Sequence, residues 1–188
     1  MNNFIEEYIV ADSEKCEFVI DWFENHKDKH ISGVYGPGGN VDTTVKDSTD
    51  IVMNIFESNE VNSIILAAIS KGVAEYKKKY YMLNDIDEWS VAPTYNIQRY
   101  NPGQGYPATH CEQSGIVDYN SMLVWTLYLN DVTDEGGTFF PYQRQLVSAK
   151  TGKLVLFPSP WTHMHRGVIS STQTKYIATG WFDYCDSK

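Results

Sequence analysis

The second half of the chain is a succession of short segments rich in β-branched and aromatic residues, with no helical stretch between them. Turn-forming groups such as Asn101-Pro102-Gly103 separate these segments. Many short strands without intervening helices are typical of a sandwich, a barrel or a jelly roll, because each strand must cover its apolar face against another sheet. The predicted strands are Thr94–Tyr100, Met122–Leu129, Gly137–Phe140, Lys153–Phe157, His163–Val168 and Thr174–Phe182.

The first half of the chain carries two apolar stripes at helical spacing. One helix is predicted to begin near Glu14, with Asp12 and Ser13 as N-cap candidates, and to end near Asn25. A longer helix is predicted to begin after Ser58 or Asn59, either of which can cap it, and to end near Lys79, where basic side chains favour a C-terminus. A short strand is predicted between the helices, at about residues 46–53. We expect both stripes to pack against one face of the β unit.

The 188 residues fit one domain and contain no internal repeat, low-complexity tract or linker. We therefore predict a single domain, residues 1–188, of the α+β class with a mainly β core. Helical support is expected mainly within residues 1–90, and the β core at about residues 91–184.

The charge balance is acidic, with a formal net charge of −9. An acidic surface repels phosphate backbones, so no nucleic-acid partner is expected, and a neutral or basic substrate fits better. The three cysteines, Cys16, Cys111 and Cys185, are widely spaced, which favours a reducing, cytoplasmic compartment over a disulfide framework. Neither a signal-peptide pattern nor a membrane-spanning segment is expected. The oligomeric state is not predicted.

A metal site is indicated by His110-Cys111-Glu112 together with His165. If the first segment is extended, residues i and i+2 point to the same face, so His110 and Glu112 lie side by side. Two histidines and one carboxylate occupy one face of an octahedral metal and leave three positions open, which is typical of non-haem Fe(II) oxygenases. His163 is an alternative to His165 as the distal ligand.

Two further residues indicate an anion site beside this metal. Lys175 follows His165 by ten residues and is expected to point inward from an aromatic strand. A buried lysine that does not bind the metal can pair with the far carboxylate of a dicarboxylic acid such as 2-oxoglutarate (2OG). Tyr100, ten residues before His110, is expected to bring its hydroxyl to the same carboxylate.

At these residues the sequence resembles the 2OG/Fe(II)-dependent dioxygenases, in particular their prolyl 4-hydroxylase-like branch. The resemblance covers about residues 46–184 and rests on short motifs that occur in the expected order. They are Tyr100-Asn-Pro-Gly-Gln-Gly-Tyr106 before His110-x-Glu112, Thr126-Leu-Tyr-Leu-Asn130-Asp-Val, Glu135-Gly-Gly-Thr138-Phe-Phe-Pro141, Gly152-Lys-Leu-Val-Leu-Phe157-Pro, His165-Arg-Gly-Val168 and Lys175 through Trp181.

The resemblance implies a double-stranded β-helix, a jelly roll that carries the metal at one mouth. It implies Fe(II), 2OG and O₂ as cofactor and co-substrates, with ascorbate as a candidate reductant. It implies His110, Glu112 and His165 as iron ligands and catalytic residues. It also implies that Tyr100, Thr138, Lys175 and Trp181 line the 2OG pocket. The implied activity is hydroxylation of a C–H bond with release of succinate and CO₂.

The sequence allows several substrates, and its carboxylate ligand differs from the one usual in the family. A peptidyl proline is the first substrate expected, and a free amino acid or another small molecule the second; a nucleobase demethylase is the third reading. A non-catalytic jelly-roll protein that binds a metal or ligand is an alternative of a different class. The family usually has Asp where this chain has Glu112, so the carboxylate reaches one methylene farther.

Overall fold

The computed structural model describes residues 2–36 and 38–185. It contains a large sheet in which every pair of neighbouring strands is antiparallel. Its strands are β1 (Glu6–Ile9), β2 (Ile31–Ser32), β3 (Thr49–Asn54), β4 (Trp89–Tyr100), β5 (Ser121–Tyr128), β8 (Lys153–Pro158) and β10 (Lys175–Tyr184). Their order across the sheet is β1-β8-β5-β10-β4-β3-β2, so β10, the last strand in the chain, lies in the middle.

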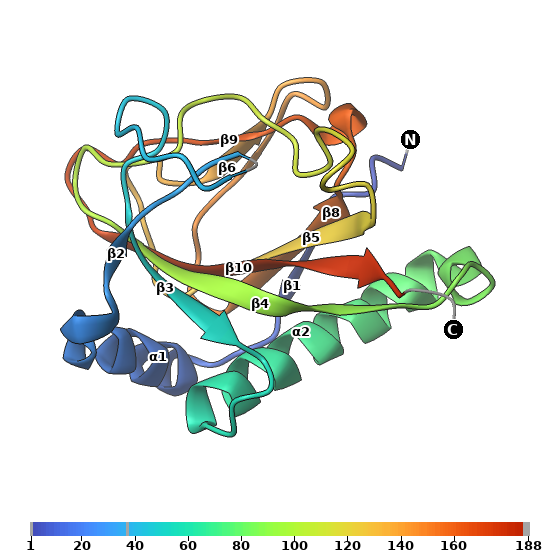
Figure 1. Cartoon of the computed structure of the whole chain (residues 1–188), viewed down its shortest axis with the longest axis horizontal. Helices are drawn as coiled ribbons and strands as arrows, with labels where there is room; N and C mark the ends of the chain where they lie inside the picture. Colours follow the sequence, from blue (N-terminus) through green and yellow to red (C-terminus); the bar gives the residue numbers. More distant parts are fainter. Residues whose placement is uncertain (1, 37, 186–188) are drawn as a thin grey trace.

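A small antiparallel sheet faces the large one (Figure 1). It consists of β6 (Thr138–Phe140), β7 (Gln145–Val147) and β9 (Arg166–Gly167), in the order β7-β6-β9. Two facing antiparallel sheets with crossing connections form a jelly roll. The predicted fold class, a mainly β jelly roll supported by helices, is therefore confirmed.

Two long helices cover the other face of the large sheet (Figure 1). Helix α1 (Ser13–Asn25) is capped by the Asp12 side chain, and helix α2 (Glu60–Lys79) by the Asn59 side chain. Each is one of the two cap candidates predicted for its helix. Short 3₁₀ turns follow at η1 (Lys27–Lys29), η2 (Tyr81–Asn84) and η3 (Trp161–His163). None of the described helices has the length and hydropathy needed to cross a membrane.

Strand alternation divides the large sheet between two cores. On β5, Trp125 and Leu127 are fully buried against the helices, whereas Val124 and Tyr128 are buried between the two sheets. The inner core is closed by Phe140 of β6 and its neighbours. The mouth of the jelly roll lacks this apolar filling, because the inner face of the large sheet becomes polar there.

The predicted strand His163–Val168 is wrong in its first half. His163 lies in the η3 turn that follows Pro160, and regular pairing is confined to the two residues of β9. A proline at the head of the turn fixes its own φ angle and donates no backbone hydrogen bond, so a sheet does not continue through it.

The N-terminal 90 residues contribute strands as well as helices, since β1, β2 and β3 extend the large sheet.

Candidate metal centre and its cavity

The metal-site residues come together through one short contact between two loops. The backbone N–H of His110 donates to the His165 carbonyl at 2.9 Å, and the His165 N–H donates to the His110 carbonyl at 2.8 Å. This isolated bridge lies outside the named strands, so His110-Cys111-Glu112 is not the regular strand that was expected. The two histidine rings nevertheless lie next to each other, with centroids 4.4 Å apart and ring planes tilted by 56°.

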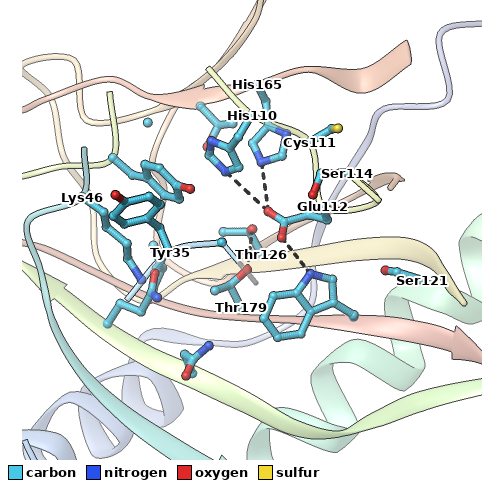
Figure 2. Close-up of a pocket in the computed structure, with 18 of the residues that line it drawn as sticks. Tyr35, Lys46, His110, Cys111, Glu112, Ser114, Ser121, Thr126, His165 and Thr179 are labelled. Atoms are coloured by element: carbon cyan, nitrogen blue, oxygen red, sulfur yellow. Dashed lines mark hydrogen bonds and ion pairs between the residues drawn. The ribbon is translucent and has the colours of Figure 1, made fainter. Parts of the chain in front are cut away.

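Glu112 completes a compact group of three potential ligands (Figure 2). Its Oε1 atom lies 3.4 Å from Nε2 of His110 and 3.5 Å from Nε2 of His165. Burial opposes ionisation of Glu112, but its contacts with His110 and His165 outweigh that effect and hold the pKa of the carboxyl well below its usual range. The group thus offers two imidazole nitrogens and one carboxylate oxygen within 4.8 Å of one another.

Both imidazole rings are held in the orientation that a metal ligand needs. Nδ1 of His110 lies 2.8 Å from the Ala108 carbonyl, and Nδ1 of His165 lies 3.0 Å from the His163 carbonyl. A carbonyl can only accept, so each Nδ1 donates to a carbonyl, and each Nε2 is left facing the site, where it can bind a metal. The set of two nitrogens, one carboxylate oxygen and an open cavity side fits Fe(II).

The rival ligand His163 is directed away from this group. Its Nε2 lies 2.8 Å from the Asn3 carbonyl, and its Nδ1 lies 3.0 Å from the Thr162 hydroxyl. Both ring nitrogens are therefore engaged elsewhere, and His163 contributes to the site only through the backbone carbonyl that orients His165.

Trp181 contacts the metal group directly. Its indole N–H donates to Oε2 of Glu112 at 3.0 Å. Oε1 of Glu112 faces the two histidines (Figure 2). The resemblance implied a place for Trp181 in the wall of the 2OG pocket, and it does line the same cavity. Its indole nitrogen, however, faces the Glu112 carboxylate.

Lys175 is the buried cation of the cavity. It is 5% exposed, and its ammonium lies 4.6 Å from the centre of the Tyr100 ring. Burial lowers the pKa of Lys175 to about 8. Among the described residues Lys175 makes no ion pair, whereas Lys46, the other buried lysine of the cavity, pairs with Asp50 at 2.8 Å. A buried ammonium without a counter-charge is suited to an anionic ligand.

Tyr100 differs from its predicted role as a hydrogen-bond donor to that ligand. Its hydroxyl donates to Oε1 of Gln98 at 2.7 Å, and Nε2 of Gln98 donates to Oδ2 of Asp50 at 3.0 Å. Because the Asp50 carboxylate can only accept, it fixes the orientation of the Gln98 amide. The hydroxyl proton of Tyr100 is therefore donated to Gln98 and not to a ligand. The aromatic ring of Tyr100 is the part that contacts Lys175.

Sequence reasoning missed one hydroxyl that lies on the same inner face. Tyr128 is fully buried, and its hydroxyl is 2.6 Å from the Thr138 hydroxyl; both residues line the cavity. Two hydroxyls that share a proton leave one proton free for a ligand. Alternation along β5, which places Thr126 and Tyr128 on one face, is the signal that could have identified this position.

The cavity that contains these groups has a volume of about 740 Å³. Its floor is the inner face of the large sheet, where the hydroxyls of Thr126 and Thr179 lie 3.2 Å apart (Figure 2). Two carboxylates, Asp118 and Asp183, lie in the same wall and also escaped the sequence reading. Burial and the neighbouring Asp118 carboxylate raise the pKa of Asp183.

Comparison with known families agrees with this geometry. The sequence profile of the 2OG-Fe(II) oxygenase superfamily matches residues 95–183, a range that includes all seven predicted site residues. Among curated protein sequences, none matches the chain significantly.

Solved structures with a similar fold include three prolyl hydroxylases. The viral collagen prolyl hydroxylase of Paramecium Bursaria Chlorella virus-1, solved with 2OG, is 17% identical, with a TM-score of 0.70 over 97% of both chains. A Pseudomonas putida prolyl-4-hydroxylase is 16% identical, with a TM-score of 0.70 over 96% of this chain and 92% of that one. A Trichoplax adhaerens prolyl hydroxylase, solved with a hypoxia inducible factor peptide, is 15% identical, with a TM-score of 0.75 over 97% of this chain and 84% of that one. At these identities the likeness is one of fold.

Proposed function

Because this chain belongs to the 2OG-Fe(II) oxygenase superfamily, we propose that it hydroxylates a C–H bond of a peptide, with His110, Glu112 and His165 as the iron ligands. Lys175 would bind the far carboxylate of 2OG. One observation carries the proposal: a group of two histidines and a carboxylate shares its cavity with a buried lysine that makes no ion pair with a described residue.

The chemistry that ferrous iron supplies, when bound with 2OG and O₂, is decarboxylation of 2OG to succinate and CO₂ coupled to hydroxylation of the substrate. One oxygen atom of O₂ enters succinate, and the other enters the new hydroxyl group. Ascorbate is proposed as a reductant that keeps the iron ferrous.

The surrounding protein residues orient the candidate metal ligands and support them with apolar contacts. The Ala108 and His163 carbonyls hold the two imidazole rings with Nε2 toward the metal position. The ring of Tyr106 stacks on His110 at 3.9 Å, and Phe157 packs against His165 at 4.8 Å, so both ligands have apolar support. Rigid support of this kind keeps the open positions of the metal available for the co-substrates.

The 2OG end of the cavity combines one charge with two hydroxyls. Lys175 would pair with the far carboxylate, and the Tyr128–Thr138 pair would donate the proton that it does not use internally. The Tyr100 ring, 4.6 Å from the Lys175 ammonium, helps to hold it in place. Charge-assisted hydrogen bonds inside a dry cavity are the strong ones, so this end should select a dicarboxylic keto acid over a monocarboxylic one.

A peptide substrate is favoured by the exposed apolar side chains beside the cavity. Ile116 is 90% exposed and Val117, which lines the cavity, is 73% exposed. Their loop is joined to residues 159–160 by the hydrogen bond from the Gln113 N–H to the Ser159 carbonyl, and Trp161, 68% exposed, follows directly. Exposed apolar side chains beside a cavity favour a substrate large enough to cover them. A free amino acid would leave them in water.

The charges of the cavity favour a basic or neutral substrate over an acidic one. With iron and 2OG bound, their charges are balanced by Glu112 and Lys175. The carboxylates of Asp118 and Asp183 are then left without a counter-charge among the described residues. A positive group on the substrate would neutralise them.

A peptide screen tests this function and its charge preference. Proline-containing peptides with a basic, neutral or acidic residue beside the target should gain 16 Da in the order basic, neutral, acidic, while free amino acids react poorly. Asp183→Asn should reduce kcat/KM for the basic peptide about fivefold and leave the neutral peptide unchanged. Asp21→Asn makes the same charge change on exposed α1 and should have no effect. Equal effects of the two substitutions, or a preference for free amino acids, would refute the substrate assignment.

A further inference from the structure

The two oxygens of the Glu112 carboxylate have different surroundings. Oε1 faces the Nε2 atoms of His110 and His165, and Oε2 accepts the indole N–H of Trp181 at 3.0 Å. An indole N–H can donate but cannot accept, and it does not titrate in the accessible pH range. The contact therefore distinguishes the two oxygens permanently and directs Oε2 away from the histidines.

The backbone at Trp181 is held by its own pairing with β5 and by the pairing of the flanking residues Gly180 and Phe182 with β4. The pairing of β10 with β4 shifts register between Gly180 and Phe182, so Trp181 has no partner on β4, while it pairs with Val124 of β5. A bulge of this kind re-aims a side chain at the rim of a barrel. At Gly180 a Cβ atom would lie 2.7 Å from the Trp125 ring, so only glycine allows β10 to approach this closely. The indole is thus held by the sheet, independently of Glu112.

A restraint on Glu112 has a chemical purpose because its side chain is longer than that of Asp. The extra rotatable bond gives the carboxylate freedom to turn both oxygens toward a metal. With a metal bound, three protein atoms, two atoms of a chelating keto acid and O₂ would together use six coordination positions. A second carboxylate oxygen would take one of the positions that the co-substrates require.

We propose that Trp181 is a positioning residue that restricts Glu112 to one ligating oxygen and so keeps a coordination position open for 2OG. The proposal rests on the function proposed above, because it takes Glu112 as an iron ligand. The proposal also explains how Glu can replace the usual Asp as a ligand. The hydrogen bond from the indole restricts the orientation of the Glu carboxylate, which in Asp is restricted by the shorter side chain.

The test is a double-mutant cycle between Trp181 and Glu112. The dissociation constant of 2OG is measured anaerobically on the Fe(II) protein from the visible charge-transfer band of the chelate. Trp181→Phe should weaken 2OG binding about tenfold in the presence of Glu112. In the Glu112→Asp background the same change should alter 2OG binding by less than about twofold, because the shorter carboxylate needs no restraint. The visible spectrum of the Co(II)-loaded protein should change with Trp181→Phe only when Glu112 is present.

A second replacement removes the donor without changing the shape of the wall. Benzothienylalanine at position 181 keeps the bicyclic ring and lacks the N–H group, so it separates hydrogen bonding from packing even if Trp181→Phe unfolds the protein. In the protein that retains Glu112, this replacement should weaken 2OG binding as much as Trp181→Phe does. Equal losses with Glu112 and with Asp at position 112, or no loss with benzothienylalanine, would overturn the proposal while the wild-type band still supports the function. A wild-type protein without the band would overturn both.

Discussion

Replacing His165 by alanine should abolish both Fe(II)-dependent 2OG binding and succinate formation. His165 is 7% exposed, and its Nε2 atom is one of three ligand atoms gathered within 4.8 Å. Without it, one imidazole and one carboxylate remain, which is too few to hold Fe(II) against water. The loss is measured by anaerobic titration of Fe(II) and 2OG, following the visible band of the chelate, and by mass spectrometry of succinate.

His163→Gln is the matched control, because it changes the neighbouring histidine on the same segment. His163 engages the Asn3 carbonyl and the Thr162 hydroxyl, so its loss should lower the free energy of unfolding by about 1 kcal/mol for each hydrogen bond and leave the chelate band intact. The opposite pattern, a band that survives His165→Ala and disappears in His163→Gln, would reassign the distal ligand.

Replacing Lys175 by methionine should weaken 2OG binding about hundredfold, or by about 3 kcal/mol. Methionine has a similar length and keeps the buried contact with Tyr100, but it leaves the far carboxylate of 2OG without a counter-charge. The loss should be specific to that carboxylate. Wild-type protein should strongly prefer 2OG over 2-oxopentanoate, which has the same keto-acid end and no second carboxylate, and Lys175→Met should bind the two equally weakly. A variant that retains the wild-type preference would show that another group binds the far end.

The pH dependence supplies a second measurement on the same residue. Burial lowers the pKa of Lys175 to about 8, so the free protein loses this positive charge as the pH rises through that value. Binding of the 2OG carboxylate requires the charged form, so the dissociation constant should be constant below the pKa and rise by up to about tenfold per pH unit above it. Lys175→Met should show no such rise.

The sequence predicted those parts of the site that depend on local geometry. Alternation along one strand was enough to turn Lys175 inward, and it is 5% exposed. N-cap candidates were enough to place the starts of α1 and α2 to within about one residue. The histidine and carboxylate of His110-x-Glu112 do lie side by side, although through a loop and an isolated bridge in place of a strand.

The parts that escaped prediction depend on contacts between distant segments. The chain from Asp50 through Gln98 to Tyr100 exists because β3 pairs with β4, with Asp50 opposite Gln98, and no local pattern specifies that register. Likewise the Trp181–Glu112 hydrogen bond spans 69 positions and depends on a bulge in β10. Periodicity identifies which face a residue occupies, but not the partner it meets there.

Labelled oxygen tests the proposed activity most directly. Fe(II)-loaded protein is incubated under ¹⁸O₂ with 2OG and a peptide that has a basic residue next to its proline. The masses of succinate and of the peptide are then measured by mass spectrometry. We predict equal amounts of succinate and hydroxylated peptide, each containing one ¹⁸O atom, and neither product with His165→Ala. Succinate no more abundant than in the His165→Ala sample, with no oxygenated peptide, would contradict the assignment and leave a jelly roll that binds its ligands without catalysis.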